Sequence, residues 1–287
     1  MSIMLNENSK IIVLGITGKQ GSFHTKKMLE YGSKIVAGVT PGKEGLEVEG
    51  IKVFNSIENA LKVVKAEWAI SFVPARFAKD SCLNALKNGL NLVVITEGIP
   101  VLDSLEIVEK AKEKNLIVIG PNCPGIISPE KSKLGIMPEH VFKQGNIGLI
   151  SRSGTLTYEI VDELTRNGFG QSTCIGIGGD PVTGTDFITC LKEFEKDSDT
   201  KAVIVIGEIG GAVEEKTAEW IKENFSKPVV AYIAGVNAPE GKTLGHAGAV
   251  ISGNKGTAKS KITAFEKAGV KVAELPSKTV ELLKGLL

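Results

Sequence analysis

The chain has 287 residues, of which 42% are hydrophobic, and its 34 basic and 33 acidic side chains leave a net charge of +1. This balance argues against a nucleic-acid-binding protein, which usually carries a basic surface, and no apolar run reaches the roughly 18 residues that a membrane span needs. The four cysteines lack metal-ligand spacing. We therefore expect no metal site and a reducing location, either the cytoplasm or, for a processed eukaryotic chain, the mitochondrial matrix.

In the first half of the chain, apolar β-branched runs alternate with amphipathic segments. Continuous apolar strands that alternate with helices are typical of a parallel sheet covered on both faces, so an α/β fold is predicted. The expected strands are Ile11–Leu14, Lys34–Val39, Trp68–Val73, Leu92–Thr96 and Leu116–Gly120, and the clearest helices are Phe77–Lys87 and Ser104–Lys114.

A stretch rich in Pro, Gly and Lys at 122–145 is interpreted as a connection between domains, and the alternating pattern restarts after it. We therefore expect two domains, 1–121 and 146–287, of which the second is another doubly wound α/β domain. Its expected strands are Ile147–Ile150, Thr173–Ile177, Ala202–Ile206, Pro228–Ile233, Ala249–Ser252 and Val270–Ala273, and its expected helices are Leu156–Asn167, Phe187–Lys196, Glu214–Asn224, Ala258–Ala268 and Val280–Leu287.

Glycine-rich loops follow several of these strands. Ligands of doubly wound sheets bind beyond the carboxyl ends of the strands, where glycines allow a phosphate to approach the backbone N–H groups at a helix N-terminus. Glycine also occurs in ordinary tight turns, but four glycine-rich loops at the ends of predicted strands favour a site that binds phosphate. The loops are Gly15–Gly21, Ser151–Gly154, Gly178–Asp180 and Gly207–Gly211.

The first loop suggests a phosphorylated ligand without identifying it. Its spacing is G-x-x-G-x-x-G, which differs from the dinucleotide-binding G-x-G-x-x-G. The following strand leads into Lys43, where an NAD site has an acidic residue. A lysine suits a ribose that bears a phosphate, so NADP and coenzyme A both fit. The chain has no Walker A pattern, and we expect another chain to bind any ATP.

One of the three histidines lies in surroundings that favour chemistry. His24 and His140 are most simply structural or exposed. His246 lies between small residues in Gly245–Ala249, as a nucleophile or phosphoryl carrier requires. The alternative is a glycine-rich turn that happens to contain a histidine.

Two further segments suit a phosphorylated histidine. Ser153–Thr155 begin a predicted helix and offer backbone N–H groups and the helix dipole to a phosphate, although an ordinary serine N-cap has the same pattern. Glu208 follows an apolar strand and would hold the imidazole in one tautomer, unless it is a solvated loop residue.

Eight motifs follow one another along the chain: GITGKQG at 15–21, VTPGK at 39–43, ITEG at 95–98, GPNCPG at 120–125, SRSGTLTY at 151–158, GIGGDP at 176–181, GEIGG at 207–211 and GHAGA at 245–249. Taken together and in this order, they resemble the motifs of the alpha subunits of succinyl-CoA synthetases (succinate–CoA ligases), over essentially the whole chain. The resemblance implies an N-terminal Rossmann-like domain that binds CoA, followed by a flavodoxin-like doubly wound domain that carries a phosphohistidine.

The resemblance also implies roles for individual residues. His246 matches the phosphorylated histidine, and Glu208 matches the glutamate that orients it. Tyr158 matches a residue that touches the substrate at the subunit interface. Residues matched to CoA binding are Thr17, Gly18, Lys19, Gln20, Lys43, Ile95, Thr96 and Glu97, with Pro74, Asn122 and Cys123 along the pantetheine path, while Ser153, Gly154 and Thr155 match the start of the helix that cradles the phosphate.

The family also implies a reaction and a partner. A beta subunit with an ATP-grasp domain would bind magnesium and ATP or GTP, in an αβ or α2β2 assembly. The phosphoryl group would pass from nucleotide to His246 and then to succinate, and the thiol of CoA would displace phosphate from succinyl phosphate, reversibly, as in the citric acid cycle. The alternatives are a sister ligase for malate, citrate or acetate, a dehydrogenase that binds NADP, and a non-catalytic CoA sensor.

Overall fold

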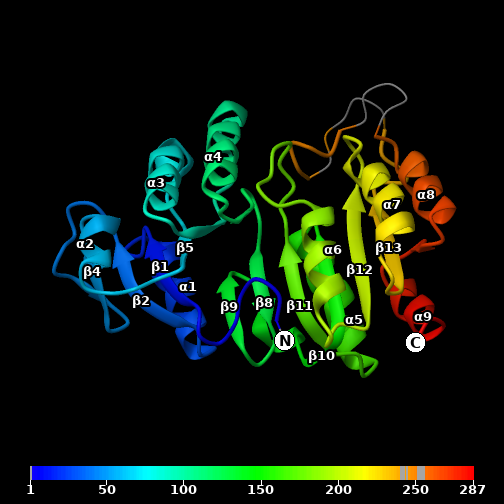
Figure 1. The fold of residues 1–287 in the computed structure, drawn as a ribbon, viewed down its shortest axis with the longest axis horizontal. Helices are drawn as coiled ribbons and strands as arrows, with labels where there is room; N and C mark the ends of the chain where they lie inside the picture. The colour runs from blue at the N-terminus through cyan, green and yellow to red at the C-terminus, as the bar shows by residue number, and fades with distance from the viewer. Residues whose placement is uncertain (1, 240–242, 244, 251–255) are drawn as a thin grey trace. The chain divides into compact units, whose positions relative to one another are not determined.

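The computed structural model describes residues 2–239, 243, 245–250 and 256–287 (Figure 1). Its contacts divide the chain into two compact units. The N-terminal unit comprises Leu5–Met137 with Val182–Gly184, and the C-terminal unit comprises Pro138–Pro181 and Thr185–Leu287 with the first few residues of the chain. No helix of the described part is long and apolar enough to cross a membrane.

The N-terminal unit is built on a sheet in the order β3-β4-β2-β1-β5-β6-β7. All neighbours pair in parallel except the short β3, which is antiparallel to β4. Numbered along the chain, the parallel strands have the order 3-2-1-4-5-6 of a dinucleotide-binding fold, as the sequence predicts. The strands are β1 Lys10–Leu14, β2 Lys34–Val39, β3 Glu47–Val48, β4 Ile51–Phe54, β5 Trp68–Ser71, β6 Asn91–Val94 and β7 Val118–Ile119.

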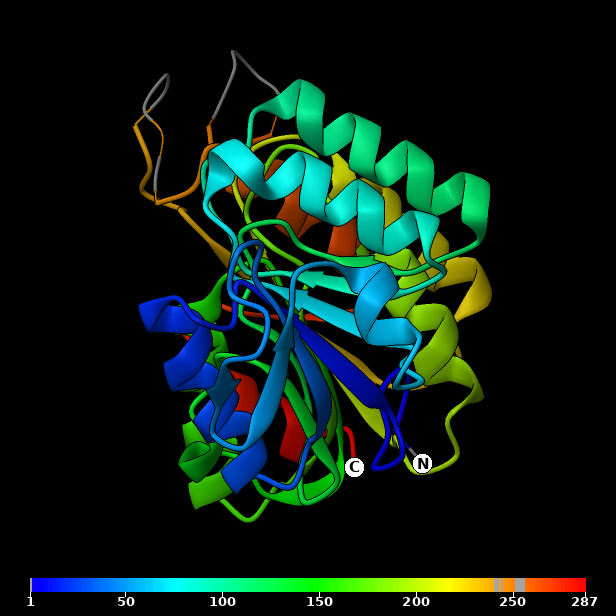
Figure 2. The same ribbon diagram turned by 90° about the vertical axis from the view of Figure 1, so that its left-hand side faces the viewer.

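Helices cover both faces of this sheet because each presents an apolar stripe to it. α3 and α4 lie on one face and α1 lies on the other (Figure 2). Ile12, Leu92 and Ile107 belong to one buried cluster that joins the strands to α3 and α4. The helices are α1 Lys19–Glu30, α2 Ile57–Leu61, α3 Ala75–Lys87 and α4 Val101–Lys114.

A hairpin of β8 (Gly125–Ser128) and β9 (Ser132–Gly135) lies within the expected connection at 122–145. Its residues are buried, and a Cβ at Gly125 would lie 2.2 Å from the carbonyl oxygen of Leu134. Glycine therefore permits a close backbone contact here, whereas the sequence pattern indicated only a connection. The hairpin belongs to the N-terminal unit, where the Ser33 hydroxyl donates to the carbonyl of Lys133 at 2.6 Å.

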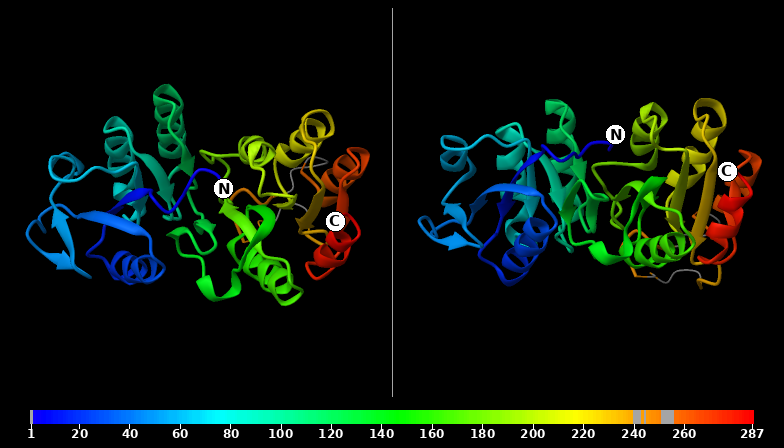
Figure 3. Two further views of the ribbon diagram at one scale, coloured as in Figure 1. Left: turned by 60° about the horizontal axis from the view of Figure 1, so that its bottom comes forward. Right: turned by 90° about the horizontal axis from the view of Figure 1, so that it is seen from below.

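The C-terminal unit has a parallel sheet in the order β14-β13-β12-β10-β11. Numbered along the chain this is 2-1-3-4-5, the flavodoxin-like order. α5 and α9 lie on one face of the sheet, with α6 and α7 on the other (Figure 3). The elements are β10 Gln144–Ser151, β11 Gln171–Gly176, β12 Ala202–Glu208, β13 Val229–Ala234, β14 Lys271–Ala273, η1 Glu139–Val141, α5 Gly154–Arg166, α6 Phe187–Lys196, α7 Val213–Asn224, α8 Ala258–Lys267 and α9 Lys278–Lys284.

Most predicted elements, α9 among them, are confirmed to within three residues at either end, and the exceptions are short. The sequence pattern did not predict β3, β4, α2, η1 or the hairpin, and it gave no bounds for α1. The expected strand Ala249–Ser252 is not a strand in its described part, where Val250 forms one isolated bridge with Thr243. Its last two residues, 251 and 252, lie outside the described residues.

Candidate functional site

In the N-terminal unit, the strand order reverses between β1 and β5, and ligands of such sheets bind at this point, beyond the carboxyl ends of the strands. A cavity of about 820 Å³ opens there. Its walls come from the loop after β1, the end of β2, the loop after β5 and the first part of α3. A cavity of this size suits an extended cofactor.

The loop after β1 is shaped by its glycines. Gly15 has a φ of +77°, and a Cβ on Gly21 would lie 2.2 Å from the carbonyl oxygen of Gly15. Any side chain at position 21 would therefore push α1 away from the strand. α1 begins after Gly18 without a side-chain cap and without an acidic residue in its first turn. Its first N–H groups thus suit an anion.

Five of the residues matched to CoA binding line this cavity: Thr17, Gly18, Lys19, Gln20 and Pro74. The other six are not among the lining residues, although hydrogen bonds connect some of them to its wall. The Thr96 hydroxyl donates to the carbonyl of Val73 at 2.7 Å, and the backbone N–H of Asn122 donates to the carbonyl of Thr96 at 3.0 Å. The six are Lys43, Ile95, Thr96, Glu97, Asn122 and Cys123.

Lys43 and Glu97 are exposed, whereas Cys123 is buried and its thiol lies 3.3 Å from the carbonyl oxygen of Val94. Cys123 therefore helps to pack the ends of β6 and β7 together. The structure brings these residues to the carboxyl edge of one sheet, but it places all six of them outside the cavity wall.

Sequence reasoning missed the aromatic part of the cavity. Phe72 lines it, and the His24 ring stacks on Phe72 with 5.6 Å between centroids. Phe77 also lines it, with the Arg76 guanidinium 4.7 Å from its ring centroid. The available signal was their place at the switch point, since Phe72 directly follows β5 and Phe77 lies in the first turn of α3. Asn55 and Ser56 also line the cavity, and they were missed because β4 was not predicted.

The C-terminal unit has a second switch point, between β10 and β12. Ser151 ends β10 and Glu208 ends β12, two strands that pair in parallel. Ser153 caps α5 by accepting from the N–H of Leu156, and its hydroxyl lies 3.3 Å from that of Thr155. The N-terminus of α5, with Gly154 as its first residue, therefore lies at the edge where Glu208 ends its strand.

His246 lies at this same edge. Its Nδ1 is 2.8 Å from Oε2 of Glu208, and its side chain is 22% exposed. The ring packs on the backbone of Gly179, where a Cβ would lie 2.2 Å from Cγ of His246. The N–H of Gly248 donates to the carbonyl of Gly179 at 3.3 Å. The GIGGDP, GEIGG and GHAGA motifs therefore meet in one place.

The contact with Glu208 controls the chemistry of the imidazole. The hydrogen bond to Glu208 raises the pKa of His246 above its ordinary value, while burial and the positive charge of Arg152 oppose the rise. In the neutral ring, a carboxylate at Nδ1 selects the tautomer with its proton on Nδ1, because Nδ1–H can donate to it. The lone pair is then on Nε2, which is the nitrogen able to attack an electrophile.

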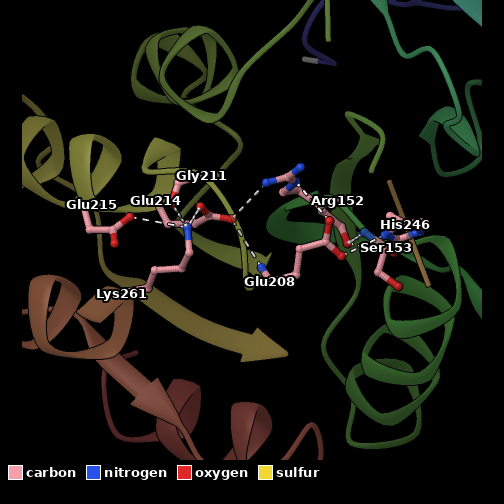
Figure 4. A network of polar contacts seen from close by, with 9 residues as sticks. Arg152, Ser153, Glu208, Gly211, Glu214, Glu215, His246 and Lys261 are labelled. Atoms are coloured by element: carbon pink, nitrogen blue, oxygen red, sulfur yellow. Dashed lines mark hydrogen bonds and ion pairs between the residues drawn. The ribbon is translucent and has the colours of Figure 1, made fainter. Parts of the chain in front are cut away.

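A chain of charged groups extends from Glu208 into the unit (Figure 4). Arg152 Nε lies 3.3 Å from Oε1 of Glu208, and Arg152 Nη1 lies 3.6 Å from Oε1 of Glu214. Lys261 pairs with the other oxygen of Glu214 and, at 3.3 Å, with Glu215. Sequence reasoning missed Arg152, Glu214 and Lys261, although Arg152 lies within the motif at 151–158.

Tyr158 lies on α5, one turn beyond the helix start, and is partly buried. Among the described residues, no cluster of His, Cys, Asp and Glu has a geometry that could hold a metal ion.

Comparisons with known proteins also divide the chain into two domains. A family model described as a CoA binding domain matches residues 6–98, and a CoA-ligase model matches residues 150–271. The chain is 54% identical over 288 residues to succinate–CoA ligase (ADP-forming) subunit alpha 2 of Archaeoglobus fulgidus, with all of both chains covered. It is 53% identical over 290 residues to the corresponding alpha subunit of Aquifex aeolicus, with 100% of this chain and 95% of that protein covered.

Solved structures share the fold. ATP citrate lyase from Methanosaeta concilii, in complex with (3S)-citryl-CoA, matches with a TM-score of 0.91 at 25% identity, over 99% of this chain and 50% of that chain. This chain thus spans about half the length of that lyase. The dinucleotide-forming acetyl-coenzyme A synthetase 1 of Ca. Korarchaeum cryptofilum matches with a TM-score of 0.77 at 23% identity, over 98% and 61% of the two chains. With relatives at this identity over its whole length, the chain belongs to the family of succinate–CoA ligase alpha subunits.

Proposed function

We propose that this chain is the CoA-binding, phosphoryl-carrying subunit of a succinate–CoA ligase, and that His246 is the residue phosphorylated during turnover. The observation that carries the proposal is the contact of His246 with Glu208 beside the start of α5. The names of the full-length relatives support succinate as the acid.

In this proposal Nε2 of His246 attacks the γ-phosphorus of a nucleoside triphosphate, and the diphosphate leaves. The Nδ1 proton remains in its hydrogen bond to Glu208, which offsets the positive charge that develops on the ring. A succinate carboxylate oxygen then attacks the phosphorus, forming succinyl phosphate and restoring the neutral imidazole. The thiol of CoA attacks the acyl carbon, releases phosphate and gives up its proton, and succinyl-CoA is formed.

The transferred phosphoryl group needs positive charge and free donors around it. We infer that the backbone N–H groups of Gly154 and Thr155, together with the positive end of α5, receive it. Ser153 would add its hydroxyl, and Tyr158 on the same helix would contact the substrate. Preformed donors of this kind stabilise the transition state because they need no reorganisation during the reaction.

CoA would occupy the cavity of the N-terminal unit, with its phosphates at the start of α1 and Thr17–Gln20 around them. Lys43 would lie toward the nucleotide end, and Pro74, Ile95–Glu97, Asn122 and Cys123 toward the pantetheine arm. The closely packed glycines at 15 and 21 support this arrangement, because they let an anion approach the backbone.

The remaining components would come from a partner. We infer a beta subunit whose ATP-grasp domain binds magnesium and ATP or GTP, in an αβ or α2β2 complex, since the chain has no Walker A pattern. Its four free cysteines are compatible with the reducing cytoplasm as the location.

Phosphoryl labelling tests the proposal. The chain is co-expressed with the beta subunit, and the complex is incubated with magnesium and γ-labelled ATP or GTP. We expect acid-labile label on His246 that is discharged by succinate with CoA. Discharge by malate, citrate or acetate instead would make the protein a sister ligase. A complex that binds CoA but acquires no label with either nucleotide would overturn the phosphohistidine role.

A further inference from the structure

Behind the candidate site lies a buried pair of opposite charges, Glu214 on α7 and Lys261 on α8, whose side chains are 0% exposed. Lys261 Nζ contacts Glu214 Oε2, Glu215 Oε2 at 3.3 Å and the carbonyl oxygen of Gly211 at 3.2 Å. An ammonium group has three N–H donors, and here each has an acceptor. These contacts supply the hydrogen bonds that a buried polar group needs.

The second oxygen of Glu214 faces the catalytic edge of the sheet. Its Oε1 accepts the backbone N–H of Glu208 at 3.3 Å and lies 3.6 Å from Nη1 of Arg152. Gly207 makes this approach possible, because a Cβ there would lie 2.8 Å from Cγ of Glu214. One carboxylate therefore holds both the backbone of Glu208 and the cation beside it.

Arg152 consequently lies between two carboxylates. It faces Glu208 through Nε and Glu214 through Nη1 (Figure 4), and its side chain is 9% exposed. A guanidinium tends to take up a carboxylate with two parallel hydrogen bonds. A second carboxylate at its other edge opposes that tendency and leaves Oε2 of Glu208 to His246.

We propose that Glu214, held in place by Lys261, is a positioning residue for the phosphoryl-carrying histidine: it retains Arg152 and the Glu208 backbone so that the Glu208 carboxylate faces His246. The inference rests on the proposed function of His246. Glu214 does not touch the reacting atoms and acts through Arg152 and Glu208.

The effect of Glu214 on the protonation of His246 depends on the charged groups that face the ring. These are Glu208 at the end of β12, Arg152 after β10 and Asp180 after β11; Glu208 and Asp180 favour the imidazolium, and Arg152 opposes it. Removing the negative charge of Glu214 leaves the positive charge of Arg152 less neutralised, and Arg152 is then drawn toward Glu208. Both effects lower the pKa of His246.

The test compares three variants, E214Q, E215Q and E214Q/K261M, in the complex with the beta subunit. E215Q is the matched control, because Glu215 pairs with Lys261, whereas Arg152 pairs with Glu208 and Glu214, and the Glu215 side chain is 21% exposed. The readouts are the His246 pKa, from NMR of this chain labelled at histidine and combined with unlabelled partner, the labelling rate against pH, and the melting temperature.

We expect E214Q to lower the His246 pKa by roughly 0.5–1 unit. It should also slow phosphorylation about 10- to 100-fold, the loss seen in metal sites when a residue that orients a metal ligand is replaced. E215Q should leave both near wild type. E214Q/K261M removes both buried charges, so the melting temperature should recover relative to E214Q, while the pKa and the rate stay low because Arg152 still lacks its second carboxylate.

Two results would overturn the inference. In one, E214Q keeps the wild-type His246 pKa and pH–rate profile. In the other, E214Q/K261M regains the pKa and the rate together with its stability, which would make the pair merely structural. The failure of the proposed function is distinguishable, because in that case the wild-type complex itself acquires no label, whereas the NMR measurement needs no turnover. If E214Q does not fold, the double variant alone decides between these outcomes.

Discussion

Oε2 of Glu208 and Nδ1 of His246 lie 2.8 Å apart, although 38 positions separate the two residues in the chain. Glu208 is the last residue of a buried strand, and His246 lies in a glycine-rich loop on the same edge. Their contact leaves the free lone pair of the neutral ring on Nε2, so the proposed chemistry of the site depends on this one hydrogen bond.

Replacing His246 tests its role as the acceptor. H246N keeps a polar side chain of similar size but has no nucleophilic ring nitrogen, and we expect turnover to fall at least about 10³-fold. CoA binding, measured by calorimetry, should persist because the cavity belongs to the other unit. H140N is the control, since His140 is exposed in η1. Normal labelling of H246N would rule out this residue as the acceptor.

The rate of phosphorylation should depend on the protonation of His246. Its pKa is raised above 6.5 by Glu208, and only the neutral ring has a free lone pair on Nε2. The labelling rate should therefore increase as the pH rises through the raised pKa. E208Q removes the charged acceptor, so the pKa should fall, the acid limb should move to lower pH, and the rate above it should drop about 10- to 100-fold. An unchanged acid limb in E208Q would contradict this assignment.

Gly179 provides the surface on which the His246 ring rests. In G179A the new Cβ would lie 2.2 Å from Cγ of His246, so the ring must move away from Glu208 or from its reactive position. A misplacement of about 1 Å can cost about 10²-fold in rate, and we expect a loss of this size in single-turnover labelling. G285A is the matched control, because its Cβ would meet only ordinary contacts. Full activity in G179A would show that the ring position is not critical.

Lys43 is proposed to contact one end of the CoA molecule. It is exposed near the cavity without lining it, so it is predicted to contact the ribose phosphate rather than the pyrophosphate. K43A should weaken CoA binding about five- to tenfold, corresponding to about 1 kcal/mol, and should weaken 3′-dephospho-CoA much less. K65A, at another exposed lysine, is the control. If K43A weakened the binding of CoA and of 3′-dephospho-CoA equally, Lys43 would not contact the ribose phosphate.

Much of the fold was predictable because its signals are local. Buried parallel strands such as Lys34–Val39 are continuous apolar runs, and Phe187–Lys196 has the spacing of an amphipathic helix; both have the predicted bounds. The hairpin of β8 and β9 lacked such a signal. Glycines such as those at 125 and 135 are typical of loops in a sequence. Only the close approach of the two backbones, which glycine permits, explains why they lie in strands.

By itself, the sequence determined the two wound domains, the glycine loops and the candidate roles of His246 and Glu208, because strand periodicity and glycine spacing are properties of neighbouring residues. The tertiary structure alone decided which charges face one another. Arg152, Glu214 and Lys261 come from a loop and two helices, and nothing in their local sequence marks them as partners. Burial makes such pairing obligatory, since a charge removed from water needs an opposite charge or hydrogen bonds close by.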